Sequence, residues 1–125
     1  MFTVLMVEDN LTFRQSLGEI LRVRFPEVRV LEAGDGTEAF GVIRSERVDL
    51  VLMDIRLPGE NGLELTKKIK RDHKGLHVII VTNHDLPEYR EAAFRYGADH
   101  YVDKNSATCE EIAGLVQSVL QQGTQ

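Results

Sequence analysis

Residues 48–59 read VDLVLMDIRLPG, a short apolar run that ends in an aspartate and a turn. Residues 48–53 are apolar except for one aspartate, and such a run is too short for a helix of ordinary length. It is typical of a strand that is covered on both faces of a sheet. Pro58 and Gly59 predict a type II turn, because proline presets φ and glycine allows the positive φ that follows. Asp54 is therefore predicted at the carboxyl end of a buried strand, where open α/β sheets bind their ligands.

The composition is that of an ordinary globular domain. The chain has 125 residues, of which 42% are hydrophobic and 28% charged, and we expect one domain at residues 1–121 with a polar tail at 122–125. No apolar run approaches the roughly 20 residues that a membrane span needs. The net charge of −5 argues against broad attraction to nucleic acid or anionic membrane. The single cysteine, Cys109, excludes an internal disulfide and favours a reducing, cytoplasmic setting.

A strand followed by a helix recurs five times along the chain. The predicted strands are residues 3–7, 28–33, 48–53, 77–82 and 99–102, each a short and largely apolar run. The predicted helices lie between Asn10 and Pro26, from Asp35 through Ile43, between Asn61 and Gly75, from Asp85 to Tyr96, and from about 106–108 onward. This alternation predicts an α/β domain with a parallel sheet, helices on both faces and right-handed crossovers.

Capping residues mark where several of these helices begin. Asn10 precedes an apolar i, i+4, i+7, i+8 pattern, which is the stripe of an amphipathic helix. Asp35 has capping-box spacing to Glu38, and Asn61 has the same spacing to Glu64. Each of these caps follows a predicted strand or the turn after it.

Polar side chains gather where the strands end, because the carboxyl ends of parallel strands meet at one edge of a sheet. The residues at or just beyond these ends are Glu8, Asp9, Gly34, Asp35, Asp54, Thr82 and Lys104. Carboxylates crowded at one edge repel each other unless a cation lies among them. A hard divalent cation relieves this repulsion, and Mg²⁺ takes oxygen ligands of which only one or two are usually carboxylates. The sequence therefore predicts Mg²⁺ as the cofactor.

The same edge suits the transfer of a phosphoryl group to a carboxylate. Lys104 supplies a second cation, and two charges ~4 Å apart gain about 4 kcal/mol at an effective dielectric of about 20. Thr82 adds a hydroxyl that can donate a hydrogen bond to an oxyanion. Asp54 would accept the phosphoryl group while the metal and the ammonium neutralise the transferring oxygens.

These residues resemble, in order and spacing, the receiver domain of two-component response regulators. The resemblance covers essentially all of the chain, and its motif consists of Glu8 and Asp9, Asp54 followed by Pro58 and Gly62, Thr82, and Tyr101 three residues before Lys104. Each of these residues alone is a weak signal, whereas one at each strand end in the family's order is a strong one.

The resemblance implies a flavodoxin-like fold, a single (βα)5 domain with a five-stranded parallel sheet in the order 2-1-3-4-5. It also implies that Asp54 takes a phosphoryl group from a phosphohistidine on a sensor histidine kinase or a histidine phosphotransfer protein. Asp9 would ligate Mg²⁺ directly, Glu8 would assist through water, and the backbone carbonyl of Arg56 would be a further ligand beside Asp54.

The resemblance further implies a switch. Thr82 and Lys104 would contact the phosphoryl oxygens, and Tyr101 would follow Thr82 inward and alter the face made by the fourth helix, the fifth strand and the fifth helix. The chain would then be mainly a regulatory phosphoacceptor that assists its own phosphorylation and dephosphorylation, rather than a conventional turnover enzyme. Homodimerisation stays open, no membrane is involved, and DNA would be contacted only through an output domain that this sequence does not contain.

The chain departs from the family's pattern near the site. Asn105 follows the lysine where proline is usual, and Asn83 follows Thr82 where a smaller residue is common and would narrow access to Asp54. Arg56 and His84 occupy positions that modulate dephosphorylation in the family, so we expect the lifetime of the phosphorylated form to depend on them.

Other functions share parts of this pattern. A phosphotransfer enzyme of the haloacid dehalogenase type also uses a strand-end aspartate with Mg²⁺, but it needs a second aspartate where Arg56 stands. A degenerate receiver that only binds partners would not need the full acidic, threonine and lysine set. The Gly34–Ala39 segment matches a dinucleotide-binding fingerprint, but Asp35 and Glu38 would place negative charge beside the pyrophosphate.

Overall fold

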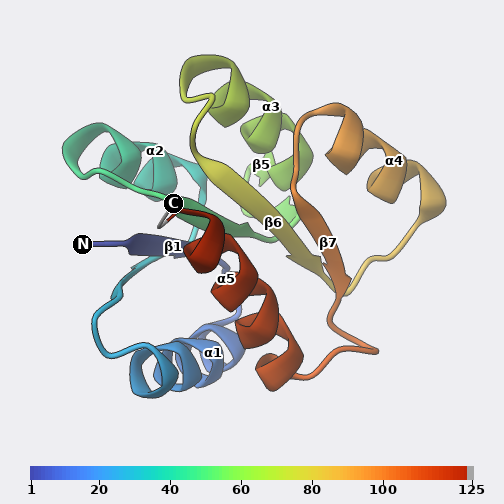
Figure 1. Ribbon diagram of the computed structural model, residues 1–125. Helices are drawn as coiled ribbons and strands as arrows, with labels where there is room; N and C mark the ends of the chain where they lie inside the picture. Colours follow the sequence, from blue (N-terminus) through green and yellow to red (C-terminus); the bar gives the residue numbers. More distant parts are fainter. Residues whose placement is uncertain (124–125) are drawn as a thin grey trace.

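The sheet has five parallel strands in the order β2-β1-β3-β6-β7 in the computed structural model, which describes residues 1–123. Its strands are β1 (Thr3–Val7), β2 (Arg29–Ala33), β3 (Leu50–Met53), β6 (His77–Thr82) and β7 (His100–Asp103). The helices are α1 (Leu11–Arg24), α2 (Gly36–Ser45), α3 (Gly62–Asp72), α4 (Pro87–Arg95) and α5 (Cys109–Gly123). The flavodoxin-like fold and the predicted strand order 2-1-3-4-5 are therefore confirmed, counting only the strands of this sheet. Figure 1 shows the helices packed around the sheet.

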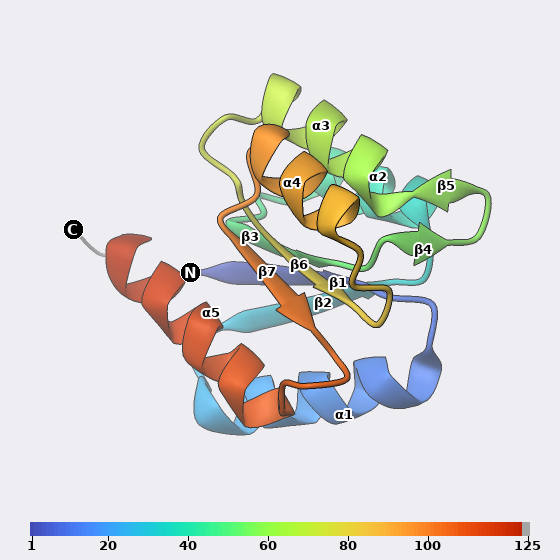
Figure 2. The ribbon, with the colours of Figure 1, turned by 90° about the vertical axis from the view of Figure 1, so that its right-hand side faces the viewer.

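The helices cover both faces of the sheet. Helices α1 and α5 lie on one face, and α2, α3 and α4 lie on the other (Figure 2). Alternate residues of each central strand point to opposite faces, so Val4 and Met6 pack with the α1 and α5 side chains while Leu5 and Val7 pack with those of α2 and α3. Because both faces are buried, the central strands are continuous apolar runs, as the sequence indicated.

Strand β3 is shorter than predicted, since it begins at Leu50 and not at Val48. Its pairing with β1 starts at Val4 opposite Leu50. The residue before it, Asp49, turns its carboxylate to the start of β1, where Oδ2 accepts a hydrogen bond of 2.8 Å from the backbone N–H of Thr3. The apolar pattern could not distinguish Val48 from the strand because Val48 is also buried.

A small antiparallel hairpin follows Asp54 that the sequence did not predict. It consists of β4 (Arg56–Leu57) and β5 (Glu60–Asn61), joined by Pro58 and Gly59. Gly59 has a φ of 72°, the positive value that the third position of a type II turn requires. The turn was therefore correctly predicted. The two strands beside it are only two residues each, which is too short for an alternation of apolar and polar residues to be detected.

The helix starts follow the capping signals closely. Asn10 Oδ1 accepts from the N–H of Phe13 at 3.0 Å, and Asp35 Oδ1 accepts from the N–H of Glu38 at 2.8 Å. Helix α4 differs, because it begins at Pro87 after Leu86, and Leu86 makes no side-chain cap.

No helix in the described part of the chain combines the length and the apolar character that crossing a bilayer requires. Helix α5 includes residues 122 and 123 of the predicted tail, and residues 124–125 lie outside the described residues.

Candidate functional site

Three carboxylates meet at the carboxyl ends of β1 and β3. These strands are neighbours in the sheet, and the backbone N–H of Asp54 donates to the carbonyl of Val7 at 3.0 Å. Each of Glu8, Asp9 and Asp54 offers a carboxylate oxygen, and these oxygens lie within 4.8 Å of one another. Glu8 and Asp54 are only 5% and 6% exposed, whereas Asp9 is exposed. The predicted acidic cluster is thus assembled by strand pairing.

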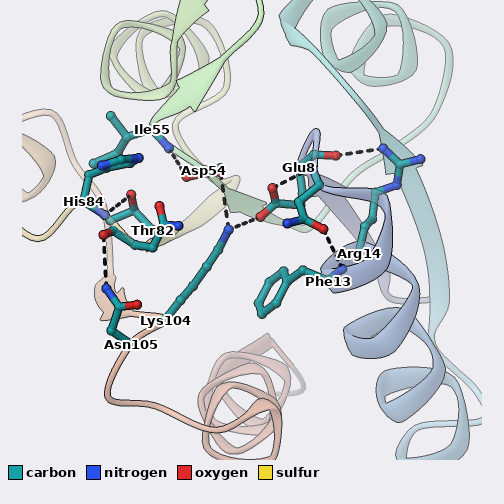
Figure 3. A network of polar contacts seen from close by, with 11 residues as sticks. Glu8, Phe13, Arg14, Asp54, Ile55, Thr82, His84, Lys104 and Asn105 are labelled. Carbon is teal, nitrogen blue, oxygen red and sulfur yellow. Dashed lines mark hydrogen bonds and ion pairs between the residues drawn. The ribbon is translucent and has the colours of Figure 1, made fainter.

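Lys104 places a cation inside this acidic cluster. Its Nζ contacts Glu8 Oε1 and lies 3.3 Å from Asp54 Oδ2 (Figure 3). The backbone N–H of Lys104 donates to the carbonyl of Thr82 at 2.8 Å, which fixes the start of the loop after β7. The ammonium also lies 4.4 Å from the centroid of the Phe13 ring, a cation–π contact. One ammonium among three carboxylates leaves an excess of negative charge, which would attract a divalent cation.

Burial is the main influence on the protonation of Glu8. It raises the pKa of the Glu8 carboxyl above its usual value, and the negative charge of Asp54 acts in the same direction. The hydrogen bonds from Lys104 and from the backbone N–H of Asn10, the latter 3.0 Å from Glu8 Oε2, act in the opposite direction. The carboxylate is therefore held by its neighbours at both oxygens.

The donor set fits Mg²⁺. A depression of about 360 Å³ opens beside the acidic cluster, lined by Glu8, Asp9, Asn10, Asp54, Arg56, Asn83, His84 and Lys104. The oxygen-rich lining and the open volume suit an ion that keeps several waters and shares a phosphoryl oxygen. Both oxygens of Glu8 and of Asp54 have partners, whereas the Asp9 carboxylate has no hydrogen bond or ion pair within residues 1–123. Asp9 is thus the carboxylate most available to a metal, with Glu8 and Asp54 beside it.

Thr82 and Tyr101 are linked through His84. Thr82 is fully buried at the end of β6, and its Oγ1 accepts a hydrogen bond of 3.1 Å from the backbone N–H of His84. The phenol of Tyr101 donates to the backbone carbonyl of the same His84 at 3.4 Å. Among the described residues, Thr82 does not line the depression. The predicted switch pair therefore has no hydrogen bond between its two side chains within the described residues, but both side chains bond to the backbone of His84.

Tyr101 is itself enclosed. The residue is 8% exposed, and the Arg90 guanidinium lies 4.6 Å from the centroid of its ring. Burial and the negative charge of Asp85 raise the pKa of the Tyr101 phenol to about 12, against the opposing charge of Arg90. The phenol is therefore neutral at physiological pH and available as a hydrogen-bond donor.

Asn105 joins the two loops that flank the site. Its side-chain Nδ2 donates to the backbone carbonyl of Asn83 at 3.1 Å, and its backbone N–H donates to Asp103 Oδ1 at 2.9 Å. The peptide bond between Lys104 and Asn105 is trans. The loop after β6 and the loop after β7 are thus held together by a contact that proline at this position could not make, because proline has no side-chain donor and no backbone N–H.

A close backbone approach explains Gly62. Its N–H donates to the carbonyl of Ile55 at 2.7 Å, and a Cβ at this position would lie 1.8 Å from the carbonyl oxygen of Asp54. The chain that leaves Asp54 therefore returns against it, and only glycine leaves room. Gly62 of the motif has a steric reason for being at this site.

Two residues that contact the site were not among those predicted from the sequence. Phe13 lies under the Lys104 ammonium, and Arg14 donates to the backbone carbonyl of Glu8 at 2.7 Å. Both belong to the first turn of α1, directly after the acidic pair. The available signal was that both residues follow closely after Glu8 and Asp9 in the sequence. The amphipathic pattern of the helix assigns Phe13 to the core, however, and indicates no partner for Arg14.

Comparison with known proteins agrees with this geometry. The chain matches the family described as response regulator receiver domain over residues 4–117. It is 31% identical over 118 residues to the probable transcriptional regulatory protein TcrX of Mycobacterium tuberculosis, a match that covers 94% of this chain and 49% of TcrX. The chemotaxis protein CheY of Halobacterium salinarum is 38% identical over 101 residues, covering 81% of this chain and 82% of that protein.

A solved structure shows the same likeness in three dimensions. The crystal structure of a CheY-like response regulator receiver domain protein from Methanospirillum hungatei JF-1 superposes with a TM-score of 0.89 at 27% identity, covering 98% of this chain and 95% of that one. The chain spans about half the length of TcrX, so it corresponds to one part of that relative. Since the family match spans most of the sequence and the fold and strand order agree, this chain belongs to the response regulator receiver domain family.

Proposed function

We propose that the chain is a phosphorylation-activated signalling switch in which Asp54 accepts a phosphoryl group from the phosphohistidine of a sensor histidine kinase or a histidine phosphotransfer protein. The observation that carries this proposal is the environment of the Asp54 carboxylate. It stands at a strand end, open to the depression of about 360 Å³, with the Lys104 ammonium 3.3 Å from Oδ2 and two more carboxylates within 4.8 Å.

The transfer is a displacement at phosphorus. A carboxylate oxygen of Asp54 forms the new bond to phosphorus while the bond from phosphorus to the donor's imidazole nitrogen breaks, and the nitrogen keeps the electron pair. Mg²⁺ held by Asp9, Asp54 and the Arg56 carbonyl, with Glu8 acting through water, would neutralise charge on the transferring oxygens. The Lys104 ammonium lies 3.3 Å from Asp54 Oδ2 and would neutralise the phosphoryl oxygens that do not contact the metal.

The output of the switch would pass through the residues around His84. The Thr82 hydroxyl does not line the depression, so it would have to move to donate to a phosphoryl oxygen. The movement would break the hydrogen bond of 3.1 Å that the hydroxyl accepts from the His84 N–H. That movement frees the peptide segment that also receives the Tyr101 phenol. Tyr101 lines a second depression of about 340 Å³ between α4, β7 and α5, so a change there would reach the face expected to bind partners. The partner that this face would bind is a second copy of the chain or an output domain.

The residues also discriminate against the alternatives. A dehalogenase-type enzyme needs a second aspartate as its general acid, and Arg56 stands at that position and lines the depression. A degenerate receiver would not need Lys104 and the carboxylates gathered at one point. These observations favour an acceptor whose aspartate is phosphorylated and whose aspartyl phosphate is later hydrolysed. They argue against an enzyme that acts on a separate substrate.

Intact-mass measurement tests the proposal. With Mg²⁺ and a small phosphodonor such as acetyl phosphate or phosphoramidate, the chain gains one phosphoryl group, and the gain disappears in Asp54→Asn and after chelation of the metal. Asp49→Asn is the matched control, because that aspartate lies at the opposite edge of the sheet and should leave the phosphoryl gain unchanged. A folded sample that gains no phosphoryl group, either from small donors or from a phosphorylated histidine kinase, would refute the proposal.

A further inference from the structure

We propose that Arg14 is a positioning residue that orients the acidic pair Glu8 and Asp9 for metal binding. The guanidinium Nη1 of Arg14 donates to the backbone carbonyl of Glu8 at 2.7 Å, as Figure 3 shows. That carbonyl belongs to the peptide group that joins Glu8 to Asp9. Fixing it therefore fixes the plane from which the Asp9 side chain departs. This inference rests on the proposed Mg²⁺ site.

Arg14 is held in place from its other side by Glu32. Its Nε lies 2.8 Å from Glu32 Oε1, and Glu32 Oε2 lies 3.0 Å from the guanidinium of Arg22. Although burial acts in the opposite direction, hydrogen bonds from Arg22 and Arg14 lower the pKa of the Glu32 carboxyl, so it is ionised at neutral pH. The planar fork of an arginine can serve two acceptors at fixed angles, which a lysine ammonium does less well.

The surrounding backbone leaves Arg14 little freedom. A Cβ on Gly34, at the end of β2, would lie 3.3 Å from Arg14 Nη1, so the glycine leaves just enough room for the guanidinium. The side chain of Arg14 is 18% exposed. Its backbone N–H donates to the carbonyl of Asn10 at 3.0 Å in the first turn of α1. Arg14 is therefore part of a fitted contact between α1, β2 and the loop after β1.

Asp9 has most need of such support. Its carboxylate is exposed and has no hydrogen bond or ion pair within the described residues, so only the backbone determines where it points. Glu8, in contrast, is held at both carboxylate oxygens. In metal sites, loss of a group that orients a ligand typically costs 10–100-fold in affinity. The positive charge of Arg14 acts in the other direction, because it repels a bound cation.

Loss of the positioning hydrogen bond would weaken Mg²⁺ binding, whereas loss of the positive charge would strengthen it, so the sign of the change in affinity separates the two effects. Mg²⁺ affinity is measured by calorimetric titration of the folded, metal-free chain, with thermal unfolding recorded for each variant. Arg14→Gln should weaken Mg²⁺ binding by about 10-fold, and Arg14→Lys, which keeps the charge, should weaken it as well. The matched control is Arg22→Gln, which removes the other partner of Glu32 but has no contact with Glu8 and should leave the affinity within about twofold. Unchanged or tighter binding in Arg14→Gln, or equal weakening in Arg22→Gln, would overturn the proposal.

A second measurement does not depend on the metal. The Glu8 carbonyl belongs to the same peptide group as the Asp9 N–H, so loss of its hydrogen bond should shift or broaden the Asp9 backbone amide signal in metal-free NMR spectra. This change should occur in Arg14→Gln and Arg14→Lys but not in Arg22→Gln, and its absence would refute the positioning role. If the unaltered chain binds no Mg²⁺, the proposed metal site fails, while the amide signal still decides whether Arg14 orients the acidic pair.

Discussion

Removal of the Lys104 ammonium should destabilise the metal-free protein by about 3 kcal/mol at neutral pH. The substitution Lys104→Met keeps much of the side-chain volume but leaves Glu8 and Asp54 facing each other without a cation. The side chains of all three residues are between 7% and 11% exposed, so water can compensate only in part. Loss of one partner from a buried ion pair typically costs 3–5 kcal/mol, and the open depression beside the site favours the lower end.

The pH dependence of this effect has a defined sign. Burial raises the pKa of Glu8 above its usual value of 4.5, so the folded protein holds a proton that the unfolded chain releases. Stability therefore falls as pH rises from 4.5 through the folded pKa. In Lys104→Met, Glu8 loses the hydrogen bond and the charge that lower its pKa, so the fall becomes larger and extends to higher pH. The variant should approach the stability of the unaltered chain in acid.

Urea unfolding at pH 7.5 and at about pH 4.5, in the presence of a chelator, measures both effects. Lys68→Met is the matched control, because Lys68 is exposed on α3 and its loss should change stability by less than about 0.5 kcal/mol. The double variant Lys104→Met, Glu8→Gln removes one of the two buried charges that the loss of Lys104 leaves without a cation, and it should recover part of the lost stability. A Lys104→Met variant as stable as the control at pH 7.5, or one that loses more stability in acid, would refute the argument.

Two further predictions concern the backbone at the site and the switch. Gly62→Ala places a Cβ 1.8 Å from the Asp54 carbonyl oxygen and should cost about 3 kcal/mol in thermal unfolding. Gly41→Ala should instead gain about 0.5–1 kcal/mol, because its Cβ would meet no described atom within 4 Å apart from chain neighbours and the backbone of its own helix. Equal stability of the two variants would contradict the steric argument. Tyr101→Ala removes the donor to His84 and should leave phosphoryl gain intact while weakening the phosphorylation-dependent change in partner affinity. A Tyr101→Ala variant whose change in affinity on phosphorylation equals that of the unaltered chain would count against the relay.

Much of the fold could be predicted from the sequence because each central strand is buried on both faces. Such strands must be apolar along their length, so β1, β3 and β6 stand out as runs, and caps such as Asn10 and Asp35 mark the helices that follow. The position of Asp54 at a strand end follows from the same pattern. The order of the strands came instead from the resemblance to receivers, because local patterns do not say which strands are neighbours.

The contacts of the site depend on tertiary structure. Lys104 and Glu8 are 96 residues apart in the sequence. They meet because the Lys104 backbone pairs with Thr82 at the end of β6, and its side chain contacts Asp54 after β3 and Glu8 after β1. The link of Thr82 to Tyr101 through the backbone N–H and the backbone carbonyl of His84 likewise requires the β6–β7 pairing. The contact of Arg14 with the Glu8 carbonyl requires β2 beside β1, since Glu32 holds the other side of the guanidinium. Residue types and their order thus determine which chemistry is available, whereas the adjacency of strands decides which groups share it, because hydrogen bonds and ion pairs act over only a few ångströms.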